Sequence, residues 1–111
     1  MRALWLLVFT LLAACASPDE IVQLASFASP PRPAYPALSR RMMEQGRVEL
    51  RVHVLANGDP GEVQLAKSSG FARLDASAMV AAKSFKFNPA RTRSGRAVDS
   101  WMNAPINYRL E

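Results

Sequence analysis

Two residue types on which catalytic and metal sites often depend are nearly absent from this sequence. The 111 residues include one cysteine, Cys15, and one histidine, His53. A single cysteine cannot form an internal disulfide, and a single imidazole supplies neither a zinc-ligand set nor a catalytic triad. The acidic residues show no spacing typical of a catalytic pair, and there is no phosphate-binding loop and no HExxH pattern. We therefore expect a protein that is not an enzyme and has no cofactor or metal, with His53 on the surface.

A hydrophobic run long enough to cross a bilayer is also missing. The longest, Ala3–Leu12, has ten residues, whereas a membrane-spanning helix needs about 20. It follows a positive charge at Arg2 and precedes Ala13-Ala14-Cys15, as in a secretory signal. The ending resembles the lipobox of bacterial lipoproteins. Residues 1–14 are therefore predicted to be a signal peptide, and Cys15 is predicted to be lipidated.

A plain signal peptide followed by a free thiol at Cys15 is the alternative. Lipidation accounts for the lone exported cysteine, and several acyl chains together give stable anchoring. Because residue 16 is alanine and not aspartate, the resemblance to lipoproteins of enteric-type bacteria implies the outer membrane. We expect a chain that is lipid-anchored at the periplasmic face of the cell envelope.

Acidic residues are outnumbered, with 9 Asp and Glu against 14 Lys and Arg, which gives a net charge of +5. Such a surface could meet nucleic acid, anionic lipid or an acidic protein. Export disfavours nucleic acid, and the basic residues are spread along the chain, as on a solvated face. We expect no nucleic-acid partner and no small-molecule substrate.

Proline and serine are concentrated in residues 15–34. Pro18, Pro30, Pro31 and Pro33 disfavour helix and sheet. We expect this stretch to be a tether that spans up to about 60 Å when extended. The folded domain is expected to be residues 35–111.

Helical patterns occur twice in residues 35–111. In Tyr35–Gly46, proline at position 36 suits the first turn, and the glycine at position 46 suits a C-terminal stop. The second helix is expected to end before Asn88-Pro89. Its apolar stripe has helical spacing and comprises Leu74, Ala78, Ala81 and Phe85.

Alternation with a period of two predicts three strands. Apolar and polar residues alternate in Val48–Val54 and again in Val63–Ala66. The turn-rich segment 57–61 joins these two strands in a hairpin. After a polar connection at 91–95, residues Val98–Leu110 form a long last strand. The order helix, strand, strand, helix, strand predicts an α+β fold, a three-stranded antiparallel sheet with two helices on one face.

Short motifs recur through residues 35–111 in a fixed order. They are Tyr35-Pro36, Gly46-Arg47-Val48, Gly58, Ser68-Ser69-Gly70, Leu74-Asp75, Phe85 and Phe87 before Pro89-Ala90, Gly95, Val98 and Pro105. Together they resemble the C-terminal, receptor-binding domain of the TonB energy transducers. The resemblance implies a binding module.

Four features depart from the family's full-length transducers. These begin with a transmembrane helix that meets a proton-driven motor, and a long Pro-rich spacer follows. Neither is present here, which leaves energy transduction itself unsupported by the sequence. Pro60 replaces a residue that is more often apolar. Arg32-Pro33-Ala34 stands where the family has a glutamine-rich contact, so receptor choice is expected to differ.

Pro105 has no N–H, so its strand should lie at a sheet edge or contain a break. An edge strand can pair with another chain. In the TonB family an extended receptor segment adds to this last strand, a mode called β-augmentation. The resemblance implies that the partner-binding residues here are Tyr35, Pro36, Ser100, Trp101, Met102, Asn103, Ala104, Pro105, Ile106 and Asn107.

Several alternatives stay open. Trp101 could instead be a half-buried aromatic packed on the sheet, and the same edge could pair with a second copy in a homodimer. The favoured function is docking on an outer-membrane receptor or another envelope protein, which takes part in or modulates TonB-dependent transport. The alternatives are an envelope scaffold lipoprotein and an envelope hydrolase that would use Ser68 or His53.

Overall fold

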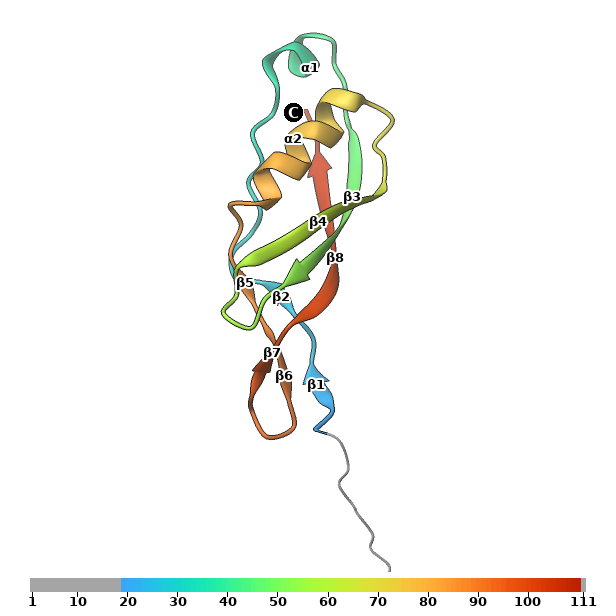
Figure 1. Cartoon of the computed structure of the whole chain (residues 1–111). Helices are drawn as coiled ribbons and strands as arrows, with labels where there is room; N and C mark the ends of the chain where they lie inside the picture. Colours follow the sequence, from blue (N-terminus) through green and yellow to red (C-terminus); the bar gives the residue numbers. More distant parts are fainter. Residues whose placement is uncertain (1–18, 111) are drawn as a thin grey trace, which may run out of the picture.

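The computed structural model describes residues 19–110 of the chain (Figure 1). The predicted signal peptide and lipidation site lie outside the described residues. Among the described residues, no helix is both long and apolar enough to cross a membrane. The elements in chain order are β1 (Ile21–Gln23), β2 (Ser26–Phe27), α1 (Ala37–Arg41), β3 (Gly46–Val54), β4 (Pro60–Lys67), α2 (Ala72–Ala82), β5 (Phe87–Asn88), β6 (Ala90–Thr92), β7 (Ala97–Val98) and β8 (Ser100–Tyr108).

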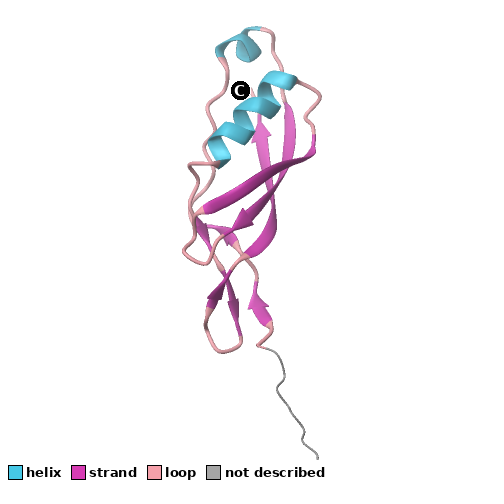
Figure 2. Cartoon of the chain, in the orientation of Figure 1, coloured by secondary structure: helices cyan, strands magenta, loops and turns pink. Residues whose placement is uncertain are grey.

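The main sheet has three antiparallel strands in the order β4-β3-β8. Helix α2 lies across one face of this sheet, and α1 lies beyond the end where β3 begins (Figures 1 and 2). The predicted α+β fold with a three-stranded antiparallel sheet is confirmed, but only α2 lies on the face of that sheet. The strands form where they were expected because their apolar residues recur every second position and bury one face.

The hydrophobic core lies between this sheet and α2. Val48, Leu50, Val52 and Val54 on β3 are fully buried, and the alternate residues of β8 join them. From α2 the buried residues are Leu74, Ala78 and Ala82. The buried hydrophobic residues of this core fall within 48–108, and Ala25, Phe27 and Tyr35 pack against them.

The second helix differs in detail from the prediction. It ends at Ala82, with Lys83 as its C-cap, and Phe85 follows it rather than belonging to it. Ala82 is fully buried, whereas Ala81 is only half-buried. The predicted apolar stripe continued from Ala78 to Ala81, three positions later. In the structure the residue that faces the core is Ala82, four positions after Ala78.

The first helix is shorter than predicted and ends before Gly46. Its last turn closes with two backbone bonds, from Glu44 N to Ser39 O (2.8 Å) and from Met43 N to Arg40 O (3.2 Å). This is the Schellman pattern of a helix C-terminus. Met43 occupies the left-handed position of that pattern, at φ 56°, where glycine is the usual residue.

Gly46 serves a different purpose from the predicted helix stop, since it is the first residue of β3. A Cβ atom built at this position would lie 3.0 Å from Ser69 Cβ and from Ser69 O. Glycine is therefore needed here for the close approach of β3 to the loop before α2.

Residues 19–34 are not the extended tether expected from their prolines. β1 pairs with β6, and β2 pairs with β5, both antiparallel. Phe27 stacks on Phe87 with ring centroids 5.5 Å apart. The expected polar connection at 91–95 is a hairpin, because β6 turns back to pair with β7. Each short strand finds its partner only through distant residues, so local composition gave no sign of the pairing.

Together β1, β6 and β7 form a small sheet at one end of the molecule, and we call this the narrow end. In Figure 1 it projects beyond the main sheet, on the side opposite α1. The body is consequently elongated, with the first described residues at one end and the α1 turn at the other.

Candidate protein-binding edge

β8 is an edge strand of the main sheet. Its pairing with β3 is continuous, from Ser100 opposite Val54 to Tyr108 opposite Gly46. Within residues 19–110, β8 pairs with β3 and with no other strand. Of the two possibilities that Pro105 left open, an edge position or a break, the structure therefore has the edge.

Pro105 also indicates which backbone groups face the free edge. It lies opposite Glu49 on β3. Proline cannot donate to a ladder, so it is accommodated where its nitrogen faces away from the partner strand. In an antiparallel pair the direction of the N–H and C=O groups alternates along the strand. The N–H groups of Trp101, Asn103 and Asn107 are therefore assigned to the free edge.

The candidate residues of β8 divide into three sets by burial. Ala104 and Ile106 belong to the core, with Ala104 fully buried and Ile106 almost fully buried. Their side chains cannot meet a partner, so any contribution from them is through the backbone. Trp101, Asn103 and Asn107 are exposed on the opposite face of the sheet. Ser100, Met102 and Pro105 are half-buried.

Trp101 packs on the sheet and remains partly exposed. Its ring stacks on His53, with centroids 4.9 Å apart, and the guanidinium of Arg51 lies 5.2 Å from its centre. It still exposes 39% of its surface. A ring held by two neighbours loses little freedom on binding, which makes it a suitable fixed contact. His53 belongs to this aromatic contact and is half-buried.

Tyr35 and Pro36 lie at the far end of β8. The Tyr35 ring packs against Tyr108, its hydroxyl donates to Glu44 O, and Arg40 lies 4.8 Å over its face. Pro36 is the N-cap residue of α1, in an extended conformation. The structure thus brings Tyr35 and Pro36 to one end of the β8 strip, while Trp101 lies at the other end.

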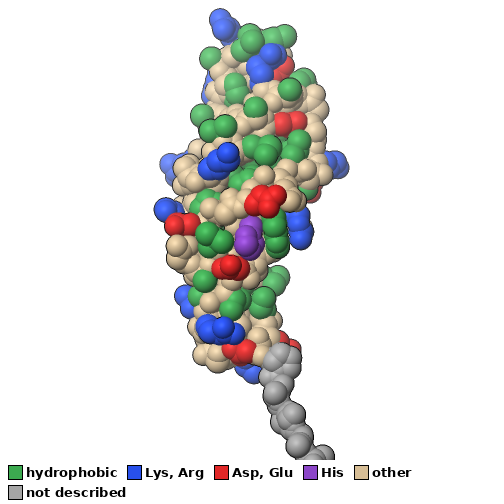
Figure 3. Space-filling model, viewed as in Figure 1, with side chains coloured by type: hydrophobic (Ala, Val, Ile, Leu, Met, Phe, Trp, Pro, Cys, Tyr) green, Lys and Arg blue, Asp and Glu red, His purple; other side chains and the backbone are tan. Residues whose placement is uncertain are grey.

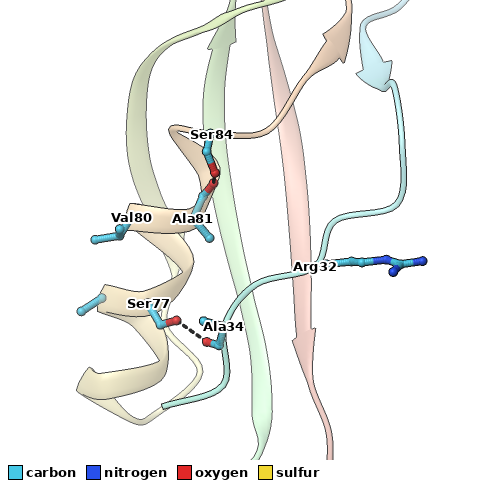
Figure 4. A pocket seen from close by; sticks show the side chains of 7 residues that line it. Arg32, Ala34, Ser77, Val80, Ala81 and Ser84 are labelled. Carbon is cyan, nitrogen blue, oxygen red and sulfur yellow. Dashed lines mark hydrogen bonds between the residues drawn. The ribbon is translucent and has the colours of Figure 1, made fainter.

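A hollow of about 500 Å³ lies between α2 and the segment before Tyr35. The Ser77 hydroxyl donates to Ala34 O at 2.6 Å and joins the two walls (Figure 4). Arg32 is at its rim, and Val80 contributes an exposed apolar wall. This hollow was not predicted from the sequence. The one sign of it in the sequence is Val80, an apolar residue that lies off the predicted apolar stripe of α2.

Ser68, Ser69 and Asp75 form a structural network and not a catalytic one. The Asp75 carboxylate accepts hydrogen bonds from Ser69 N (2.9 Å) and Ser69 Oγ (2.8 Å), and from the Ser68 hydroxyl. Partial burial acts to raise the pKa of Asp75, but these hydrogen bonds outweigh it, so the pKa is lowered. The motif therefore fixes the loop that leads into α2.

The ordered motifs, the strand order and the open β8 edge can be compared with known proteins. The family model described as "Gram-negative bacterial TonB protein C-terminal" matches residues 31–110. The chain belongs to the TonB C-terminal domain family. Its fold is also similar to the solution NMR structure of the Pseudomonas aeruginosa TonB C-terminal domain. The TM-score is 0.63 with 18% sequence identity, over 78% of this chain and 87% of that one.

Three relatives show the extent of the similarity. Protein tonB2 of Pseudomonas aeruginosa is 46% identical over 86 residues, which are 78% of this chain and 32% of that protein. Protein TonB of Xanthomonas campestris is 41% identical over 78 residues, 70% of this chain and 34% of its own. Protein TonB of Neisseria gonorrhoeae is 53% identical over 57 residues, 51% of this chain and 20% of its own.

The TonB C-terminal family is a protein-interaction module and not an enzyme family, which makes the chain non-enzymatic. The chain spans about a third or less of the length of these relatives. The matched part corresponds to the domain that the sequence motifs indicated.

Proposed function

We propose that this chain is a lipid-anchored periplasmic TonB-like module that docks an extended segment of an outer-membrane receptor on β8. In this way it takes part in or modulates TonB-dependent transport. The observation that carries the proposal is the free edge of β8, which is continuous over nine residues and unpaired on its outer side within the described part of the chain.

Docking would proceed by β-augmentation. The outward N–H and C=O groups of Trp101, Asn103 and Asn107 would pair with the backbone of the incoming segment. Side chains of the segment that point to the helix side would meet the hollow beside Ala34 and Val80, where an apolar wall is available. Backbone pairing would supply affinity, and these side-chain contacts would supply selectivity.

The lipid anchor at Cys15 is the second part of the proposal. It is supported by the position of the cysteine after an apolar leader and small residues, and by the absence of any other cysteine. Metabolic labelling with radioactive palmitate tests it directly. Wild-type protein should be labelled and sediment with membranes, and Cys15→Ser should lose the label.

An NMR titration tests the docking. Isotope-labelled mature chain is titrated with a synthetic peptide copied from the plug-proximal segment of a TonB-dependent receptor. Amide shifts should be concentrated at residues 100–108 and near Tyr35. A titration that shifts only residues before Ser39, or that shifts none, would overturn the docking proposal.

An envelope scaffold that uses the same edge for contacts unrelated to transport is the second candidate. It is favoured by the unpaired β8 edge, which is open to an extended segment of any partner and is not specific to a receptor. Deletion of the gene followed by measurement of iron-chelate or vitamin uptake separates the two functions. Reduced uptake supports the transport role, and unchanged uptake supports the scaffold.

A homodimer through the β8 edge would compete with receptor docking. Sedimentation velocity over a range of concentrations distinguishes the two, because a dimer made by edge pairing should dissociate when the receptor peptide is added.

A further inference from the structure

Within the narrow end, the turn between β6 and β7 is bonded to the first two described residues of the chain. Arg93 N donates to Glu20 O at 3.0 Å, and the guanidinium of Arg93 pairs with the Glu20 carboxylate. The Ser94 hydroxyl donates to Asp19 Oδ2 at 2.7 Å. The turn between β6 and β7 therefore lies beside the residues through which the chain enters the fold. Any attachment upstream of Asp19 holds this turn close to it.

The narrow end also exposes apolar side chains that residues 19–110 cover only in part. Ile21, Val22 and Leu24 are all exposed, and Leu24 exposes 79% of its surface. Three branched aliphatic residues within four positions are more than the scattered apolar residues of an ordinary surface. Burial of such side chains against an apolar phase is favourable by about 25 cal/mol per Å².

The hairpin that pairs with β1 carries three arginines. They are Arg91, Arg93 and Arg96, and Arg96 lies 3.7 Å from Asp19. Figure 3 shows hydrophobic, basic and acidic side chains together at this end of the molecule. Three arginines against Asp19 and Glu20 leave an excess of 3 − 2 = +1. The apolar residues would thus supply most of the binding free energy at this surface, and its small positive charge favours an anionic partner surface.

A short chain connects this surface to the predicted anchor. Cys15 and Asp19 are four residues apart in the sequence, a distance of at most about 14 Å when extended. Aliphatic side chains flanked by arginine are the composition of an interfacial membrane contact. A soluble protein partner would not require proximity to the anchor, whereas a lipid surface meets both conditions.

We propose that the narrow end is a membrane-contact surface, in which Ile21, Val22 and Leu24 enter the headgroup region and the hairpin arginines meet anionic lipid. This inference rests on the proposed anchor at Cys15. It orients the domain, because β8 runs from Ser100 near the narrow end to Tyr108 near α1 (Figure 1). The docking edge then stands upright on the membrane, with Tyr35 at its distal end.

The test uses the mature chain, residues 15–111, coupled through Cys15 to a maleimide lipid in phosphatidylethanolamine–phosphatidylglycerol nanodiscs. A small fraction of gadolinium-chelate lipid broadens amide signals near the membrane. Broadening should be strongest at residues 21–24 and 91–97 and weakest at residues 38–44. Equal broadening at both ends, or stronger broadening at residues 38–44, would overturn the inference.

Flotation of the unlipidated Cys15→Ser mature chain with vesicles supplies the matched comparison. Ile21→Ser, Val22→Ser and Leu24→Ser combined should lower the bound fraction at least fivefold. The control combines Met42→Ser and Met43→Ser, which remove exposed apolar residues at the opposite end. It should change the bound fraction less than twofold. Equal losses in both variants would overturn the inference.

Two further readouts separate the possible failures. Replacing phosphatidylglycerol with phosphatidylcholine should weaken flotation. Flotation that does not depend on lipid charge would overturn the part of the proposal in which the hairpin arginines bind anionic lipid. Light scattering without vesicles detects a dimer, and a dimer that disappears in the triple serine variant would show that a second copy covers the surface. Because coupling in vitro bypasses cellular lipidation, a failed nanodisc experiment is distinct from a failed palmitate experiment.

Discussion

Tyr35 and Tyr108 meet edge to face with ring centroids 5.3 Å apart, and this contact joins the segment before α1 to the end of the last strand. The Tyr35 hydroxyl donates to Glu44 O, so one side chain ties three parts of the chain together. The Tyr-Pro motif is thereby a structural clamp at the distal end of β8 as well as a candidate contact.

Two substitutions of Tyr35 should separate the contribution of its ring to stability from that of its hydroxyl. Tyr35→Phe keeps the packing and removes one hydrogen bond, so we expect a loss of about 1 kcal/mol in unfolding free energy. Tyr35→Ala removes the ring as well and should cost about 3 kcal/mol. Urea unfolding followed by circular dichroism measures both. Equal losses in the two variants would show that the ring contact contributes nothing.

Met43→Gly should stabilise the domain. Met43 adopts φ 56° and exposes 73% of its surface, so the side chain adds strain and little packing. Relief of the left-handed strain, less the greater freedom of glycine in the unfolded chain, should give about 0.5–1 kcal/mol. A higher thermal midpoint than wild type is the expected result.

Met42→Gly is the matched control for this prediction. Met42 has φ −90°, where glycine relieves no strain. This variant should lose about 0.5–1 kcal/mol. If both glycine variants lowered the midpoint, the strain assigned to Met43 would be absent.

Asp75→Asn should destabilise the domain in a pH-dependent way. The substitution weakens charge-assisted hydrogen bonds from Ser68 and Ser69, at a cost of about 1–2 kcal/mol at pH 7. The folded-state pKa of Asp75 lies below its unfolded value. Its contribution is therefore complete above the unfolded pKa, and it is lost as the pH falls through the folded one.

Urea unfolding at pH 7 and at pH 3 and below measures this dependence. The difference between wild type and Asp75→Asn should shrink toward the acid end. Glu62→Gln is the control, because the Glu62 carboxylate is exposed on β4 and bonds only the Gln64 side chain among the described residues. A gap between wild type and Asp75→Asn that does not change with pH would contradict the assignment.

Asn103→Pro should weaken peptide docking without loss of the fold. The Asn103 N–H is assigned to the free edge, so its removal spares the ladder with β3 and eliminates one bond to the incoming segment. We expect peptide affinity to fall about five- to tenfold. Isothermal titration calorimetry with the receptor peptide measures this loss.

Two neighbouring variants make the result specific. Asn103→Ala keeps the N–H and should bind within twofold of wild type. Ala104→Pro removes a donor that faces β3 inside the core and should destabilise the domain by about 3 kcal/mol or more. Wild-type affinity in Asn103→Pro would show that the segment does not pair with this edge.

Local sequence patterns predicted the elements in which apolar residues recur at a regular spacing. The alternation of Val48, Leu50, Val52 and Val54 predicted β3, and Pro105 indicated the edge. The narrow end escaped prediction because Ile21 pairs with Thr92, and no local signal connects positions so far apart. The α1 boundary was misplaced since Met43 takes the conformation that glycine usually takes.

The candidate site was predicted to a similar degree. The sequence identified the strand and the Tyr-Pro pair, and the two-residue period of Val98–Leu110 grouped Ala104, Ile106, Tyr108 and Leu110 on one face. The structure buries the first three of these residues and exposes Asn103 on the other face. The hollow beside Val80 depends on where residues 32–34 cross α2, a tertiary arrangement that no short motif encodes.

The pairing of the first strands with the last third of the chain has a consequence for assembly. Ser26 and Asn88 are 62 positions apart, and Glu20 and Arg93 are 73 apart. A chain that emerges N-terminus first offers β1 and β2 no partner until nearly all of it is available. Contacts of such separation close late, after the local hairpin and helix. The end nearest the proposed anchor would then be the last to form, so the contacts that hold the domain beside its attachment point would close after the main sheet.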